Sequence, residues 1–159
     1  MSLRRNTSGG IRRRLAKARS LSGAEWLFLV RGFFLLAAVQ IGLRLLSFGR
    51  LVALLRREDF RSRRSSVDPE RAAYLVELAS RFQLRRPSCL HKALVLYRLL
   101  RGNGVRVDLV IGAKKAEEKL DAHAWLEHQG HIILGAAEAA CYAPLLALDA
   151  AGGLAKPDR

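Results

Sequence analysis

The sequence predicts an α+β fold in which helices come first and a small antiparallel sheet follows. Apolar residues recur at helical spacing in the first two thirds of the chain, whereas short segments after Gly104 alternate between apolar and polar residues. Helices followed by strands, rather than alternating helix and strand units, are typical of α+β architecture. The 159 residues are enough for one domain and an appended arm, because a domain commonly holds about 100–200 residues.

Positive charge is concentrated near the N-terminus. Residues 1–66 contain 15 basic and 3 acidic side chains and residues 67–159 contain 13 and 11, so the two parts carry +12 and +2 of the net +14. Residues 1–20 are predicted to form a basic flexible arm. A localised excess favours an anionic partner: nucleic acid, a membrane surface or an acidic peptide. Nucleic acid is the least favoured, because aromatic residues do not interleave with the arginines of the arm and no recognition helix follows.

Residues 21–66 are predicted to form a helical N-terminal portion. Ser22 and Glu25 have the spacing of a capping box, and a strongly apolar stretch follows over residues 26–46. Polar side chains interrupt this stretch at Arg31, Gln40 and Arg44. A lone membrane span is therefore disfavoured, since a central arginine costs a few kcal/mol on insertion. We expect a long buried helix here, with an interfacial helix or one docked on a partner as the alternatives.

A second short helix is expected at residues 51–55, before the core over residues 67–150. Asp68 followed by Pro69 predicts a helix running to Phe82, and another helix is expected from Ser88 to the Gly-Asn-Gly turn at residues 102–104. Strands are expected at residues 105–111, 122–127 and 131–134, with a charged loop or hairpin tip at 114–119 and a turn at 129–130. Residues 151–159 are expected to be a frayed tail.

Cys89 is placed where a thiol becomes reactive. It opens a predicted helix, where free N–H groups and the positive helix dipole stabilise a thiolate. A catalytic cysteine also needs a base, which is commonly a histidine from a distant segment. His123 begins an alternating segment in which His123, Trp125 and Glu127 share one face. From these residues alone, a buried structural thiol and a histidine bonded to a backbone carbonyl stay open as alternatives.

The other residues with catalytic or ligand chemistry give weaker signals. Cys141 follows an alanine-rich stretch and is expected to be structural. His91 lies two residues after Cys89 on the same helix, where side chains face apart. Metal-ligand spacing, a Walker-type loop and a dinucleotide fingerprint are all absent, so we expect no cofactor and no metal. Two cysteines and no secretory signal predict reduced thiols and a cytoplasmic location, with membrane association left open.

Four segments occur in an order that is more specific than any single motif. They are the cysteine helix with its following turn at residues 87–105, the strand segments 109–112 and 122–127, and the ending at 142–148. Together with upstream residues that include Glu25, Trp26 and Phe48, they resemble the transglutaminase-like leader peptidases that mature lasso peptides. The resemblance covers about residues 22–148.

The resemblance implies a papain-like cysteine peptidase core that removes the leader from a ribosomally made precursor before macrolactam closure. By matching positions, Cys89 is the nucleophile and His123 its general base. The expected partners are the lasso precursor peptide, a separate leader-recognition protein and an ATP-dependent lasso cyclase, with peripheral membrane contact as a further expectation.

One position departs from the pattern of the family. Members usually place an aspartate twelve residues after the histidine to orient the imidazole, and here that position is Gly135. Glu127, Asp121 and Glu138 are the carboxylates that could substitute, and the sequence leaves the choice open. The departure motivates an alternative function, namely a non-catalytic scaffold of the same fold that docks precursor, maturation partners or membrane.

Overall fold

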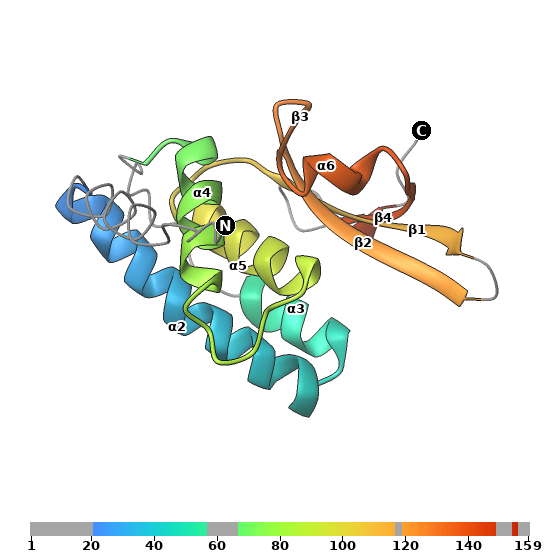
Figure 1. The fold of residues 1–159 in the computed structure, drawn as a ribbon, viewed down its shortest axis with the longest axis horizontal. Coiled ribbons are helices and arrows are strands. Elements are labelled where there is room, and N and C mark those ends of the chain that lie inside the picture. The colour runs from blue at the N-terminus through green and yellow to red at the C-terminus, as the bar shows by residue number, and fades with distance from the viewer. Residues whose placement is uncertain (1–20, 57–66, 117–118, 149–153, 156–159) are drawn as a thin grey trace, which may run out of the picture.

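The computed structural model describes residues 21–56, 67–116, 119–148 and 154–155. The elements in chain order are α2 (Gly23–Leu45), α3 (Phe48–Arg56), α4 (Pro69–Ser80), α5 (Cys89–Gly102), β1 (Asp108–Ala116), β2 (Lys119–His128), β3 (His131–Leu134), α6 (Ala136–Ala139), β4 (Ala143–Leu148) and β5 (Leu154–Ala155). Four helices precede an antiparallel sheet in the part of the chain that the structure describes, so the α+β class predicted from the sequence is confirmed (Figure 1). The predicted arm, residues 1–20, and the polar run at 57–66 lie outside the described residues.

The helix starts follow the capping signals of the sequence. The Ser22 hydroxyl accepts a hydrogen bond from the Glu25 N–H (3.2 Å), and the Glu25 carboxylate accepts one from the Ser22 N–H (2.8 Å), which confirms the capping box of α2. The Asp68 carboxylate accepts hydrogen bonds from the N–H groups of the next helical turn and starts α4. α4 ends at Ser80, two residues before the predicted end, and α5 has the predicted bounds to within one residue.

α2 is not the buried helix that its apolar composition predicts. Four of its residues are buried, and they lie on the side that packs against α4 and α5: Phe28, Gly32, Leu36 and Val39. Large side chains on the opposite side are exposed, because no other described helix covers that side of α2 (Figure 1). By length and composition alone α2 could cross a membrane. Composition predicted the helix correctly and its burial wrongly, because burial depends on how many neighbours the fold supplies.

The sheet has the strand order β3-β2-β1-β4-β5, with every neighbouring pair antiparallel. β1 and β2 pair from Asp108 opposite Glu127 to Ala116 opposite Lys119. The segment predicted as a loop or hairpin tip, residues 114–119, therefore continues the ladder over most of its length, with 117–118 outside the described residues. β1 also starts three residues later than predicted, because backbone pairing rather than apolar alternation sets its ends.

The C-terminal elements were not predicted. β4 pairs with β1, and β5 pairs with β4 at Leu154 and Ala155, within the tail that we expected to be frayed. β4 has no alternation of apolar and polar residues, so its strand conformation depends on β1 as a neighbour more than on its own sequence pattern. The one-turn helix α6 lies between β3 and β4 and contacts β2.

The two faces of the sheet pack against different partners. Leu109 of β1 and Leu126 of β2 belong to the main core that the helices form, and α5 packs on this face. Val110 and Trp125 point to the other face, where they pack with Ala139 of α6. β3 pairs with β2 only at residues 126–128, so the neighbouring part of β2 is approached on that side by Gly135 and α6. This part of β2 carries His123.

Candidate active site

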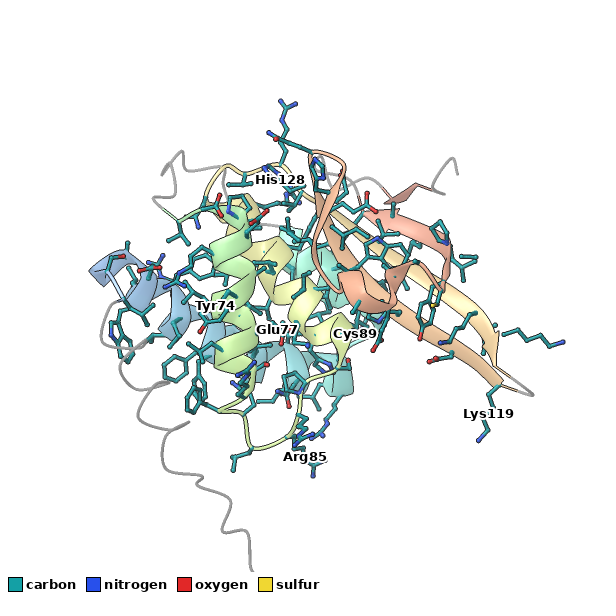
Figure 2. The ribbon with its side chains drawn as sticks, turned by 45° about the horizontal axis from the view of Figure 1, so that its top comes forward. Tyr74, Glu77, Arg85, Cys89, Lys119 and His128 are labelled. Carbon is teal, nitrogen blue, oxygen red and sulfur yellow. The ribbon has the colours of Figure 1, made fainter. Side chains whose placement is uncertain are left out.

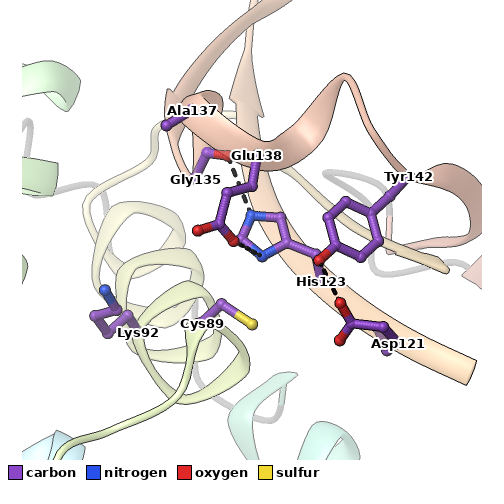
Figure 3. A pocket seen from close by; sticks show the side chains of 9 residues that line it. Cys89, Lys92, Asp121, His123, Gly135, Ala137, Glu138 and Tyr142 are labelled. Carbon is purple, nitrogen blue, oxygen red and sulfur yellow. Dashed lines mark hydrogen bonds and ion pairs between the residues drawn. The ribbon is translucent and has the colours of Figure 1, made fainter. Parts of the chain in front are cut away.

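Cys89 and His123 lie in one pocket. The pocket has a volume of about 450 Å³ and is lined by Cys89, Lys92, Asp121, Ala122, His123, Gly135, Ala137, Glu138 and Tyr142. Cys89 is the first residue of α5 and is half-buried, whereas His123 on β2 is buried, with 6% of its surface exposed. Figure 3 shows the Cys89 thiol below the imidazole of His123 in this pocket. The start of α5 and β2 therefore meet at this pocket, which brings together the two residues that the sequence analysis singled out from distant segments.

His91 takes part in the N-terminal cap of α5. The Ser88 N–H donates to His91 Nδ1 (3.2 Å), and the Ser88 hydroxyl lies 2.6 Å from the same nitrogen. Burial lowers the pKa of His91 below its usual value, and the positive charge of Arg44 acts in the same direction. His91 thus serves as a neutral acceptor in a cap, in agreement with the prediction that it does not face the thiol. The free N–H groups of the first helical turn remain at this end of α5.

A backbone carbonyl orients the imidazole of His123. His123 Nε2 lies 3.1 Å from the carbonyl oxygen of Gly135. Because a carbonyl oxygen can only accept, Nε2 carries the proton of this hydrogen bond. In the neutral ring, Nδ1 then holds the lone pair, and Nδ1 is the nitrogen on the side of Cys89 (Figure 3). The hydrogen bond to Gly135 therefore favours the tautomer that can take a proton from the thiol.

Gly135 is required at this position by its backbone. Its φ is +83°, in the left-handed region that favours glycine. A Cβ placed on Gly135 would lie 3.0 Å from His123 Nε2 and 3.0 Å from the Trp125 Cβ. The family resemblance expects an aspartate here, and the structure has a carbonyl that contacts the same imidazole instead.

The three carboxylates that the sequence left open make different contacts. Glu138 on α6 places Oε2 3.4 Å from His123 Nδ1. Asp121 accepts a hydrogen bond from the Tyr142 hydroxyl (2.8 Å), and Glu127 accepts one from Trp125 Nε1 (2.8 Å). Since Nδ1 has no proton in the neutral ring, the contact with Glu138 becomes a hydrogen bond when His123 is protonated. Glu138 is therefore placed to stabilise the imidazolium.

Two aromatic rings hold the plane of the imidazole. Tyr142 stacks on His123 with ring centroids 5.2 Å apart, and Trp125 lies 6.2 Å away at an interplanar angle of 20°. The hydrogen bond to the Asp121 carboxylate raises the pKa of Tyr142, and the same bond lowers the pKa of Asp121. Sequence reasoning placed Trp125 beside His123 by strand alternation. It missed Tyr142, which follows α6 and reaches the ring only through the fold.

Comparison with known proteins identifies the family. A family model described as the transglutaminase-like superfamily matches residues 34–147. The chain belongs to the transglutaminase-like superfamily. No match was found among curated proteins or among solved structures.

The range matched by the transglutaminase-like model begins inside α2 and ends in β4, so it includes the pocket with Cys89 and His123. Proteins of this superfamily are typically cysteine-peptidase-like. At this level the family agrees with the chemistry that the pocket residues supply.

The structure also places the second cysteine of this transglutaminase-like chain and tests for clusters of metal-binding side chains. Cys141 is exposed and is not among the residues that line the pocket, which agrees with the expectation that it is not the catalytic thiol. It follows α6 in a turn at the surface, where the alanine-rich stretch gives it no cover. Among the described residues, there is no group of three or more His, Cys, Asp or Glu side chains that could hold a metal ion.

Proposed function

We propose that this protein is a cysteine peptidase that removes the leader from a ribosomally made lasso peptide precursor before macrolactam closure. The observation that carries the peptidase assignment is that Cys89 and His123 line one pocket, with Nδ1 on the side of Cys89 and Nε2 bonded to the Gly135 carbonyl. The superfamily match supports cysteine-peptidase-like chemistry. The substrate class rests on the resemblance of the cysteine helix, the histidine strand and the ending at residues 142–148.

In the proposed reaction, Nδ1 of His123 takes the proton from the Cys89 thiol, and the thiolate attacks the scissile carbonyl carbon. The oxyanion that forms lies near the free N–H groups at the start of α5. The C–N bond then breaks as the protonated imidazole gives its proton to the leaving amine. Water hydrolyses the acyl-enzyme after giving a proton to Nδ1, and the thiol is restored.

Residues 67–150 form the papain-like core in this proposal, with the nucleophile at a helix start and the base on a strand. Glu138 and the carbonyl of Gly135 each contact one of the two nitrogens of the imidazole. Glu138 stabilises the imidazolium, and the carbonyl holds the tautomer of the neutral ring. The aspartate expected by the resemblance is thereby replaced by two groups.

The alternative function is a non-catalytic scaffold of the same fold. It was motivated by Gly135, which has no side chain to orient the histidine. The contact from the Gly135 carbonyl to Nε2 is one that a structural histidine could also make, so by itself it does not separate the two functions. The presence of the Cys89 thiol in the same pocket favours the catalytic assignment.

The proposed partners follow from the substrate class. We propose that a separate recognition protein presents the leader, that the lasso precursor peptide is the substrate, and that an ATP-dependent cyclase closes the macrolactam downstream. The peptidase itself would act without a cofactor.

The decisive experiment is cleavage of the precursor in the presence of the recognition protein, with Cys89→Ala and Cys141→Ala compared. Cys89→Ala should abolish cleavage, and Cys141→Ala should leave it unchanged, because Cys141 is exposed outside the pocket. Full cleavage by the Cys89→Ala variant would end the peptidase assignment. Wild-type protein that is folded, carries a thiol reactive toward iodoacetamide and still fails to cleave would favour the scaffold.

A further inference from the structure

The outer side of α2 carries an apolar stripe that is exposed along the helix. Its large side chains are exposed by 51% at Leu27, 38% at Val30, 67% at Phe34, 57% at Ile41 and 77% at Leu45. At about 100° per residue, all of them fall within about 60° of Leu27 around the helix axis. Over about 1.5 Å per residue, the stripe is about 27 Å long. A continuous apolar surface of this kind marks an interaction site.

Charged and amphipathic residues border the stripe. The same helical spacing places Arg31 on one margin and Arg44 on the other, both of them exposed. Trp26, 51% exposed, lies near the first turn of α2. Tryptophan favours the boundary between water and the lipid headgroups, and arginine pairs with anionic headgroups.

The opposite side of α2 is committed to the protein core. Phe28, Gly32, Leu36 and Val39 pack toward α4 and α5, so α2 cannot be surrounded by lipid while the domain is folded. A helix with one side on its own protein and an exposed apolar stripe on the other can lie in the plane of a membrane surface.

We propose that the α2 stripe docks the protein on an anionic lipid surface, with α2 lying parallel to it. The positive charge of the N-terminal part of the sequence favours an anionic lipid surface as the partner of the stripe. Residues 1–20, which precede α2, contain seven basic and no acidic side chains, and residues 1–66 carry a net charge of +12. Basic residues next to an interfacial helix are attracted to anionic headgroups, and stable attachment commonly needs both an apolar and an electrostatic contribution. The proposal does not depend on the peptidase assignment.

The test is co-sedimentation of the full chain with vesicles of phosphatidylglycerol and phosphatidylcholine, compared with phosphatidylcholine alone. The α2 variant is Phe34→Ser with Ile41→Ser. The matched control is Leu120→Ser with Leu145→Ser, since these side chains are 74% and 53% exposed and lie on β2 and β4, away from α2. The α2 variant should partition about tenfold or more weakly onto the anionic vesicles, and the control by less than about twofold.

A second measurement uses the unaltered stripe. Brominated lipid in the anionic vesicles should quench the fluorescence of the wild-type protein, and Trp26→Phe should remove most of the quenching, because Trp125 is buried with 4% exposure. Absence of binding by the folded wild-type protein would overturn the proposal, as would equal binding to neutral vesicles or equal losses in the two double variants. A stable dimer in lipid-free solution that the α2 variant dissociates, without vesicle binding, would assign the stripe to a second copy and also overturn it.

Discussion

His123 is held by groups that differ in charge. The Gly135 carbonyl contacts Nε2, and the Glu138 carboxylate approaches Nδ1, where the thiol proton must arrive. A neutral carbonyl binds the charged imidazolium less strongly than a carboxylate at the same distance would, because the carbonyl carries no net charge to attract the imidazolium. The orientation of the imidazole therefore depends on the backbone at Gly135. The positive charge of the protonated ring is balanced by the Glu138 side chain at the surface.

Gly135→Asp is expected to lower the rate of leader cleavage and the stability, rather than to restore the aspartate of the family. The left-handed φ of +83° costs a non-glycine residue about 1–2 kcal/mol. The added Cβ also meets His123 Nε2 at 3.0 Å. Single-turnover cleavage and urea denaturation measure the two effects.

The matched control for that substitution is Gly130→Ala, compared with Gly135→Ala. Gly130 has a φ of +81°, and its Cβ would meet nothing within 4 Å. The two alanine variants should lose similar backbone stability, while only Gly135→Ala should lose cleavage beyond its loss of stability. A faster cleavage rate in Gly135→Asp than in wild type would show that the carbonyl does not orient the ring.

Glu138→Gln is expected to slow cleavage by less than about tenfold, because an ion pair with an exposed carboxylate is screened by water. The Glu138 side chain is 68% exposed and lies 3.4 Å from Nδ1. Asp121→Asn and Glu127→Gln provide the comparison, since their carboxylates bond to Tyr142 and Trp125. A loss as large as that of His123→Ala in any one of the three would identify that carboxylate as the main orienting group.

At the scale of elements, strand β1 is shaped by the aromatic side chain of its neighbour. Gly112 lies opposite His123 in the ladder, next to a shift in register between β1 and β4. A Cβ on Gly112 would lie 2.8 Å from ring atoms of Trp125 and 2.9 Å from the Ala143 carbonyl oxygen. Because Gly112 has no side chain, the Trp125 ring can lie over β1 and β4 can pair closely with β1. Both contacts are next to His123.

Gly112→Ala should therefore destabilise the protein by about 1–3 kcal/mol, the usual cost of overpacking. Gly32→Ala on α2 should be neutral or stabilise by up to about 1 kcal/mol. The nearest atom to a Cβ on Gly32 lies 3.8 Å away, and glycine weakens a helix interior. Urea denaturation midpoints measure both changes. Equal destabilisation by the two variants would contradict this account of the packing.

At the scale of the whole molecule, the site forms where the helical layer meets the sheet. Cys89 belongs to α5 and His123 to β2, and residues of α2, α4, α5, β1 and β2 share one core cluster. Figure 2 shows α5 with Cys89 between the other helices and the sheet. The distance between thiol and imidazole is thus set by the packing of the helices against the sheet.

Removal of residues 1–19 should leave the alkylation rate of Cys89 by iodoacetamide unchanged, while it weakens association with an anionic surface. The deleted residues carry all seven basic side chains of the predicted arm. Their contribution should fade as salt rises, because the screening length falls to about 3 Å at 1 M. Thiol reactivity that is lost in the folded deletion variant would show that the arm forms part of the site.

The sequence by itself determined the features that depend on neighbours along the chain. The capping residues Ser22 and Asp68, the helix that begins at Cys89 and the shared face of His123 and Trp125 are all confirmed, because turns, caps and periodicity are set within a few residues. The selection of Cys89 and His123 also came from the sequence, and the structure places them in one pocket.

Only the tertiary structure determined which residues from different elements contact one another. The Gly135 carbonyl at Nε2, Glu138 rather than Asp121 or Glu127 near Nδ1, and Tyr142 on the imidazole all depend on the path of the chain after β3. The exposed stripe of α2 likewise depends on the absence of a described neighbour on its outer side, and β4 on pairing with β1. These contacts join residues that are far apart in space until the layers pack, so no local pattern in the sequence encodes their distances.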